Sequence, residues 1–441
     1  MTEFQDRLNV AISRRTLLKA AGAGALGMSA AALLDACGLG AVKGTGSGNS
    51  GKITIGYVSP QTGPLAGFAT GDNYVINGVR SSSPYKNGFK VGGKGYDVEI
   101  VVKDTQSDPN RASQVARELI LSNSVDIVLC SSTPEVTNPV ADVCEANGVP
   151  CVATIVPWES WFFGRGGKPG QGFNFTTMFF FGLNEFKGCF FPMWDRMNTN
   201  KVVAGMYPND ADGNAFRGNF IPLVTGAGYK MVDGGAFTDG TSDFTSMISK
   251  FKSNDCQIFT NCPIPPDFNT FWKQASQQGY KPKLATVAKV LLFPADTTAL
   301  GDLVVNIATD CWWSPFHPYT STLTGQTAKQ LADGFEAATG QQWLSSLGSV
   351  HSLFEVAHAA LTAVNDPHDK TAVATSLKSL SYTGISGPLD WTKGPMPGVA
   401  IQQPVGVQWV KGTKYPYSMV VVDNSLNKDV PVNGELVPTN A

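Results

Sequence analysis

Beyond about residue 50, apolar positions follow two alternating patterns along the chain. Short runs rich in Val, Ile and Ala are typical of buried parallel strands, and longer segments with apolar residues three and four positions apart are typical of helices. Turns rich in Gly, Pro, Asp and Ser separate them. The expected strands are 53–58, 98–102, 125–129, 149–153, 201–207, 231–235 and 257–259, and the expected helices are 71–80, 112–122, 139–146, 215–223, 244–251 and 269–277.

This alternation of strands and helices predicts an α/β fold with two doubly wound parallel-sheet lobes. The pattern restarts after residues 158–182, a segment rich in Gly and aromatic residues. A chain of 441 residues also exceeds the ~250–300 residues at which a single core stops growing. Ligands of open α/β sheets bind beyond the carboxyl ends of the strands. The candidate binding loops are therefore 59–70, 104–109, 130–138, 154–165, 207–214, 260–268 and 309–316.

The first 52 residues predict export. Arg14 and Arg15 precede an apolar run at 20–34, which is too short for a comfortable membrane span and resembles a twin-arginine signal. Leu34-Asp35-Ala36-Cys37 resembles a lipobox, which implies cleavage after residue 36 and lipidation of Cys37. Residues 37–52 are then a flexible tether. The protein is expected in the periplasm or on the outer face of the cytoplasmic membrane. Alternatively, Cys37 is an ordinary residue of a soluble secreted protein.

Composition narrows the possible functions. The chain is 42% hydrophobic and only 15% charged, with a formal net charge of −2. This charge gives nucleic-acid binding no electrostatic basis. Beyond Cys37 there are seven cysteines, an odd number that leaves at least one thiol unpaired even if export permits disulfides. No cofactor is expected.

An exported metal-dependent hydrolase is a weaker alternative. His351, Glu355 and His358 lie on one face of an expected helix and are possible metal ligands. They lack the HExxH spacing, and the apolar residues around them favour an ordinary helix surface. The chain also contains no GxSxG nucleophile motif. These observations favour a binding protein over an enzyme.

Several motifs together resemble one family. ITIGYVSPQTGPLAGFA (53–69), VVKDTQSDPNRASQVARELI (101–120) and VCEANGVPCVAT (143–154) are similar to type I periplasmic solute-binding proteins of ABC importers, in the branch of the leucine/isoleucine/valine-binding and amide-binding receptors. The motifs at 201–216, 241–252, 271–282 and 387–394 continue the match.

The resemblance implies two lobes joined by a three-crossing hinge that closes on a small organic ligand, an amino acid or an aromatic or carboxylate compound. It implies an ABC permease as partner, and a ligand-sensing receptor for a signalling system is the alternative. The expected boundaries are lobe I at 53–176 with a return at 293–388, and lobe II at 177–292 with further strands and the tail at 389–441.

The loop at 131–139 offers the groups that a ligand carboxylate needs, namely hydroxyls and a helix N-terminus capped by Thr137 or Asn138. A simple capping role for these hydroxyls is the alternative. The resemblance assigns carboxylate binding to this loop and to the end of the next strand. The candidate residues are Thr133, Glu135, Val136, Thr137, Ala153, Thr154, Ile155 and Val156.

The resemblance also places Phe68 over the ligand and Asp267 opposite a ligand ammonium, although Asp267 is equally suited to cap the helix that follows. Three aromatic clusters in or near the candidate loops suggest walls for a bulky ligand, although such clusters are often core. Arg165 is expected to be a solvated loop charge. The remaining candidate ligand-binding residues are Trp158, Phe180, Tyr207 and Trp312.

Overall fold

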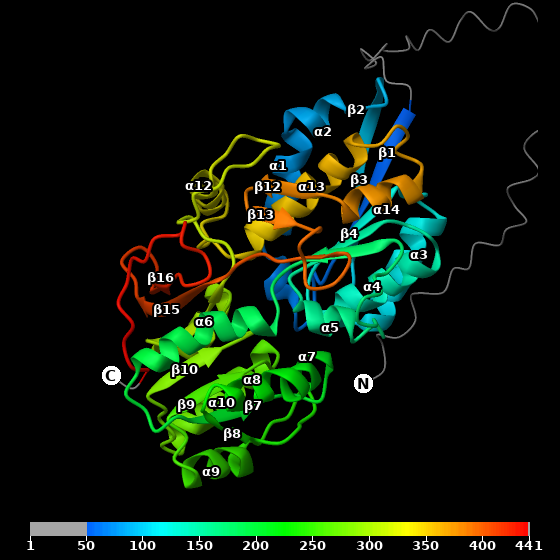
Figure 1. The fold of residues 1–441 in the computed structure, drawn as a ribbon. Helices are drawn as coiled ribbons and strands as arrows, with labels where there is room; N and C mark the ends of the chain where they lie inside the picture. Colours follow the sequence, from blue (N-terminus) through cyan, green and yellow to red (C-terminus); the bar gives the residue numbers. More distant parts are fainter. Residues whose placement is uncertain (1–50, 440–441) are drawn as a thin grey trace, which may run out of the picture. The chain divides into compact units, whose positions relative to one another are not determined.

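The structure is a computed structural model that describes residues 51–439 (Figure 1). The expected export signal, the lipidation site at Cys37 and most of the tether lie outside the described residues. Between residues 51 and 439, no helix combines the length and the apolar character needed to cross a membrane.

The first sheet has seven strands in the order β14-β6-β5-β4-β1-β3-β2. Its central strand is β4; the neighbouring strand β1 pairs in parallel with β3 and β4, and β2 joins the edge in antiparallel fashion. Every residue of β4 and β5 is buried, as expected for strands covered on both faces. The bounds are β1 Gly51–Ser59, β2 Phe89–Val91, β3 Lys94–Asp104, β4 Ile127–Cys130, β5 Cys151–Thr154, β6 Thr176–Phe179 and β14 Val399–Ala400.

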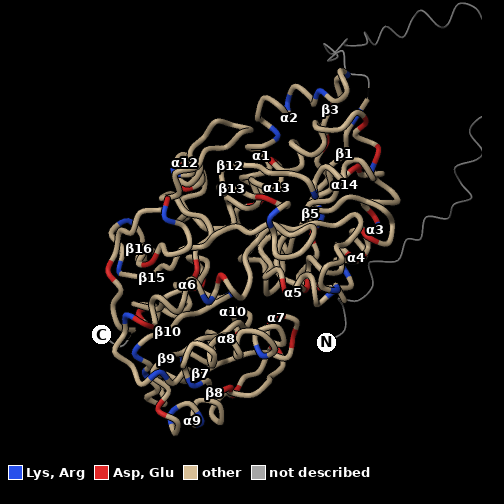
Figure 2. Tube along the Cα trace, viewed as in Figure 1, with Lys and Arg blue, Asp and Glu red and all other residues tan. Residues whose placement is uncertain are grey.

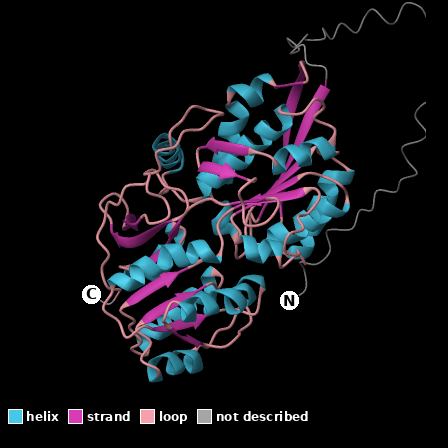
Figure 3. Cartoon of the chain, in the orientation of Figure 1, coloured by secondary structure: helices cyan, strands magenta, loops and turns pink. Residues whose placement is uncertain are grey.

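Helices lie on both faces of this sheet (Figure 3). The pair α3 and α4 covers one face, and α13 packs with α1 on the other. Local sequence fixes where α3 begins, because Pro109 occupies its first turn and the Asp108 carboxylate accepts a bond from the Arg111 amide at 2.7 Å. The bounds are η1 Ala66–Ala69, α1 Asp72–Ser81, α2 Ser83–Asn87, α3 Pro109–Leu121, α4 Pro134–Ala146, α5 Trp158–Phe162, α12 Ala328–Thr339, α13 Ser346–Thr362 and α14 Lys370–Lys378.

The second sheet also has seven strands, in the order β16-β15-β11-β10-β9-β7-β8. Five strands are parallel, and β15 and β16 close one edge in antiparallel fashion. The strands are β7 Val202–Met206, β8 Lys230–Asp233, β9 Ile258–Asn261, β10 Leu284–Val287, β11 Ala308–Cys311, β15 Val405–Lys411 and β16 Tyr417–Asp423. The helices are α6 Leu183–Arg196, α7 Ala211–Ala215, η2 Phe216–Phe220, α8 Ile221–Gly226, α9 Thr245–Ser253, α10 Pro265–Gln277, α11 Pro294–Leu300 and η3 Gly301–Val304. A hairpin of β12 Ser381–Gly384 and β13 Gly387–Asp390 stands apart.

These sheets define two α/β lobes, called lobe I and lobe II here, as the sequence pattern predicted. The chain passes between the sheets three times, after Phe179, after Cys311 and after Ala400. The corresponding boundaries were expected at 176/177, 292/293 and 388/389. The second differs most because β11 carries Thr309 and Asp310, whose polarity hid a strand that belongs to lobe II.

Positions of charged residues are scattered along the backbone of both lobes, with basic and acidic residues interspersed (Figure 2). The interior is apolar, and its largest fully buried side chains include Trp161, Trp194 and Trp312. Both observations agree with the low share of charged residues in the sequence.

Candidate ligand-binding cleft

A cavity of about 30 Å³ lies where the carboxyl ends of the strands of both lobes meet. Such a volume has room for only about two water molecules, so the two lobes are closed on each other. In lobe I, its walls come from η1 and from the segments that follow β4, β5 and β6. In lobe II, they come from β11 and from the segments that follow β7, β9 and β10. The lining residues are Phe68, Thr133, Ile155, Pro157, Phe180, Phe181, Phe186, Asp212, Phe216, Cys262, Ala288, Lys289, Leu292, Asp310 and Trp312.

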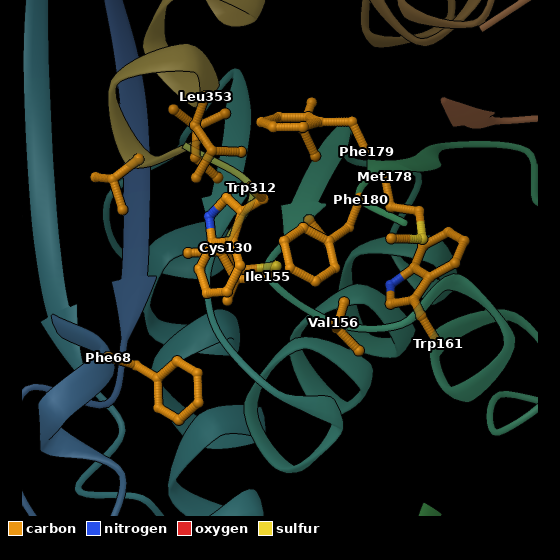
Figure 4. Close-up of a cluster of buried hydrophobic side chains, with 14 of the residues drawn as sticks. Phe68, Cys130, Ile155, Val156, Trp161, Met178, Phe179, Phe180, Trp312 and Leu353 are labelled. Atoms are coloured by element: carbon orange, nitrogen blue, oxygen red, sulfur yellow. The ribbon is translucent and has the colours of Figure 1, made fainter. Parts of the chain in front are cut away.

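Five of the residues proposed from the sequence line this cavity: Phe68, Thr133, Ile155, Phe180 and Trp312. They come from five separate stretches of the chain that the fold brings together. Figure 4 shows Phe68, Ile155, Phe180 and Trp312 in one cluster of buried side chains. The carboxyl-end rule and the cavity thus point to the same region of the molecule.

Aromatic rings form the apolar wall of the cavity. Phe180 stacks on Phe181 with a centroid distance of 4.1 Å and meets Trp312 edge to face at 5.1 Å. Phe186 lies against Phe181 at 4.9 Å and against Phe216 at 5.3 Å. Offset and edge-to-face rings of this kind offer a flat ligand further stacking surfaces. The wall suits a ligand with an aromatic or bulky apolar part.

Thr133 gives the lobe I side of the cavity a free hydrogen-bonding group. Its Oγ1 is buried without a hydrogen-bond partner, and its amide donates to the Ile155 carbonyl at 2.9 Å. The helix was expected to begin near residue 139, but α4 begins at Pro134, so Thr137 lies inside it. Thr137 therefore caps nothing, and its Oγ1 donates back to the Thr133 carbonyl at 2.8 Å. Pro134 can begin α4 because proline has no backbone N–H, and residues in the first turn of a helix have no intrahelical acceptor for theirs.

The structure places the other candidates outside the cavity lining. Thr154 uses its hydroxyl to bond the Phe179 carbonyl at 2.8 Å, and the Tyr207 ring packs on Phe216 with centroids 5.4 Å apart. Both side chains thus have packing roles within a lobe. The candidates that do not line the cavity are Glu135, Val136, Thr137, Ala153, Thr154, Val156, Trp158, Tyr207 and Asp267.

Asp267 has a partner elsewhere in lobe II. Its two carboxylate oxygens accept from the Gly240 amide at 3.0 and 3.1 Å, and burial raises the pKa of its carboxyl to about 6. Because α10 begins at Pro265, Asp267 lies within its first turn and not at the N-cap position, which Ile264 occupies. The carboxylate ties the loop before α9 to α10.

A single buried cation holds three carboxylates beside the cavity. The Lys289 ammonium lies 2.8 Å from Asp212, 3.3 Å from Glu135 and 3.6 Å from Asp210. Burial by itself lowers the pKa of Lys289, but the charges of Asp212, Glu135 and Asp210 outweigh it and raise that pKa well above its usual range. The ammonium therefore stays charged. Since Glu135 belongs to lobe I and Lys289 to lobe II, this ion pair crosses the cleft.

Asp310 presents an unpaired carboxyl to the same cavity. Its side chain is 2% exposed, its Oδ1 has no hydrogen-bond partner, and it forms no ion pair with any residue in 51–439. Burial raises the pKa of this carboxyl to about 7. Trp312, two residues further on, lines the cavity with an indole N–H that also has no partner.

Arg165 differs from its expected role as a solvated charge. Its side chain is fully buried, with the guanidinium 4.4 Å from the Trp161 ring centre and 3.9 Å from that of Phe173. It also forms an ion pair with Asp142 at 2.7 Å. Trp161 and Phe173 therefore form, with Arg165, a buried cation–π cluster inside lobe I.

The possible metal ligands of α13 have structural partners. His351 Nε2 is 2.7 Å from the Ser321 hydroxyl, Glu355 accepts from the Ile385 amide at 3.0 Å, and His358 packs on Phe89. Within residues 51–439, no group of three His, Cys, Asp or Glu side chains has the arrangement of a metal site.

The seven cysteines of the described region are all buried and unpaired. Two of them, Cys130 on β4 and Cys151 on β5, have sulfur atoms 3.8 Å apart. The thiols thus contribute to the core of the lobes.

The loop after β10 was the main site element that sequence reasoning missed. It supplies Ala288, Lys289 and Leu292. The run Leu284–Val287 is short, apolar and preceded by Pro282, so it carries the same signal as the strands that were recognised. Asp212 and Asp310 lie in or beside loops that were named, but nothing local marked their carboxyls as facing a cavity.

Comparison with known proteins identifies the family. The periplasmic binding protein family matches residues 52–414 of the chain. The Leu/Ile/Val-binding protein homolog 3 of Brucella melitensis is 26% identical over 51% of this chain and 58% of its own length. The Leu/Ile/Val-binding protein BraC3 of Rhizobium johnstonii is 24% identical over 74% of this chain and 83% of its own length.

Solved structures share the fold at low identity. A leucine-binding protein from Thermotoga maritima has a TM-score of 0.69 and 19% identity, covering 83% of this chain and 97% of that one. An ABC transporter solute-binding protein from Rhodopseudomonas palustris, in complex with 3,4-dihydroxybenzoic acid, has a TM-score of 0.67 and 17% identity, with coverages of 88% and 98%. The chain therefore belongs to the type I periplasmic binding proteins, a family of solute-binding proteins.

Proposed function

We propose that this protein is the extracytoplasmic receptor of an ABC importer and that it binds a small organic molecule, an amino acid or an aromatic compound, between its lobes. The observation that carries the proposal is the cavity, whose lining combines an aromatic wall with unpartnered polar atoms from both lobes. A ligand in contact with both walls stabilises the closed form, because those contacts exist together only when the lobes meet.

No bond is broken in this function. The residues that line the cavity bind and enclose the ligand. His351 and Glu355, the other candidate chemical groups, have hydrogen-bond partners within the chain. Delivery follows when a permease stabilises the open form and the ligand loses one of its two walls.

We also propose a lipid anchor at Cys37. The strand β1 begins at Gly51, and its carboxyl end faces the cleft. A tether that enters the fold at the amino end of β1 leaves the cleft free to face a permease. Replacing Cys37 with Ala should move the protein from the membrane fraction to the soluble fraction, and unchanged membrane association would contradict the anchor.

The experiment that tests the receptor function is thermal denaturation of residues 52–441 with a panel of amino acids, aromatic acids, aromatic amines and sugars. A ligand present at 100 times its dissociation constant adds ~2.7 kcal/mol, which raises the melting temperature by several degrees. A shift confined to one chemical class supports the proposal. The absence of any shift across the panel would contradict it.

A further inference from the structure

Asp310 and Trp312 present complementary hydrogen-bonding groups to the cavity. Asp310 lies in β11, Trp312 directly follows the last residue of that strand, and both line the cavity. Asp310 Oδ1 is an acceptor and Trp312 Nε1 a donor, both are buried, and neither has a partner. Buried polar atoms of native proteins are nearly always satisfied, so this pair points to a group that arrives from outside the chain.

The charged side chains around the cavity determine which ligand group could meet Asp310 and Trp312. The one lysine that lines it, Lys289, is already bound by Asp212, Glu135 and Asp210. Asp310 therefore has no cation available within the site, and carboxylates outnumber cations there. A ligand carboxylate would add one more negative charge to this enclosed space, whereas a ligand ammonium would provide the missing counter-charge.

The aromatic wall of the cavity lies beside Asp310 and Trp312. Trp312 meets Phe180 edge to face at 5.1 Å, and Phe180 stacks on Phe181. A ligand that places its charged nitrogen at Asp310 therefore has these rings beside it for its apolar part.

Resting on the receptor function proposed above, we infer that Asp310 determines specificity by accepting a hydrogen bond from a protonated amine, and that the cleft prefers aromatic amines to aromatic carboxylates. Asp310 supplies the counter-charge, the rings around Trp312 enclose the aromatic part, and Lys289 remains a structural cation. The preference follows from the residues of lobe II, because Asp310, Asp212 and Lys289 all belong to it.

Three probes with the same skeleton test the preference: 2-phenylethylamine, phenylalanine and 3-phenylpropanoate. Titration calorimetry of residues 52–441 should rank 2-phenylethylamine at least tenfold tighter than 3-phenylpropanoate. The substitution Asp310→Asn should weaken binding of the amine at least tenfold and leave binding of the carboxylate unchanged or improved. Asp310→Ser, which also removes the charge, should give the same order if the Asn variant folds poorly.

Asp72→Asn is the matched control. Asp72 is also a 2% exposed acidic residue, but it does not line the cavity and its carboxyl lies beside the Tyr57 and Ser59 hydroxyls, so amine binding should not change. Tighter binding of 3-phenylpropanoate, or an Asp310→Asn variant that binds the amine normally, would overturn the inference and leave the receptor function standing. Failure of all three probes to bind would also overturn it. The receptor function itself would fall only if the wider panel gave no shift.

Discussion

The Lys289 ammonium lies 3.3 Å from Oε1 of Glu135, an ion pair that joins the loop after β10 in lobe II to the first turn of α4 in lobe I. The same ammonium is 2.8 Å from Asp212, so one cation links the two lobes and offsets part of the negative charge of the carboxylates around it. The Glu135 carboxyl responds to this contact: burial raises its pKa, but the Lys289 charge and the hydrogen bonds to the carboxylate together outweigh burial and hold the pKa below its ordinary value. The pair therefore contributes to keeping the lobes closed.

Lys289→Met should destabilise the protein by about 3–5 kcal/mol, because it leaves buried carboxylates without their counter-charge. The measurement is the free energy of unfolding from urea denaturation. Lys329→Met is the matched control, since Lys329 pairs with Asp333 on an exposed helix face and its loss should cost less than about 0.5 kcal/mol. Equal effects of the two substitutions would contradict the role assigned to Lys289.

Phe68→Ala should weaken ligand binding about tenfold. The Phe68 ring of lobe I meets Phe293 of lobe II edge to face at 4.8 Å, and this contact exists only between closed lobes. Such a pair contributes about 0.5–1.5 kcal/mol, the upper end of which is a tenfold change in affinity. Calorimetry with the ligand found in the panel is the measurement. Phe163 has an exposed ring outside the cavity lining, so Phe163→Ala should bind the ligand normally. An equal loss of affinity in both variants would contradict the prediction.

The two threonines Thr133 and Thr154 should separate binding from stability. Thr133→Val removes a hydroxyl that has no partner within the chain, so it should leave stability unchanged and weaken binding. Thr154→Val removes the bond to the Phe179 carbonyl and should cost about 1 kcal/mol of stability. The melting temperature and the ligand affinity of both variants are the measurements. A loss of stability in Thr133→Val together with a loss of affinity in Thr154→Val would contradict the prediction.

The pH dependence of stability should change in Asp310→Asn. The Asp310 carboxyl has a pKa of about 7 in the folded protein against 3.8 as its ordinary value, so folding favours its protonated form. The wild-type protein therefore loses stability from this group as pH rises from about 4 to about 7, by up to roughly 4 kcal/mol, and the loss persists at higher pH. The Asn variant does not titrate.

Urea midpoints at several pH values between 4 and 8 check this prediction. The advantage of Asp310→Asn over wild type should be near zero at pH 4 and largest above pH 7. An advantage that is constant over this range would contradict an ionising carboxyl in the folded protein.

The sequence determined the kind of fold, and it predicted the edge of the sheets at which the cavity lies. Runs such as Ile127–Cys130 are apolar throughout because helices cover both faces of the strand, and the spacing of Val115 and Leu119 is that of a helix with one buried face. Both signals depend on neighbours in the chain, so they can be read locally. The carboxyl-end rule named the loops that contain Phe68, Thr133 and Trp312 without any coordinates, and the family resemblance singled out Phe68 within its loop.

The tertiary structure decided which side chains of those loops face the cavity and which partners they have. Thr133 is free while Thr137 is bonded within α4, a difference set by one helix start at Pro134. Asp267 has an amide partner while Asp310 has none, although both are acidic residues near strand ends. Lys289 and Glu135 are 154 positions apart in sequence and meet only because the lobes close. Electrostatic and hydrogen-bond energies depend on distance in space, which the sequence pattern does not encode for residues so far apart.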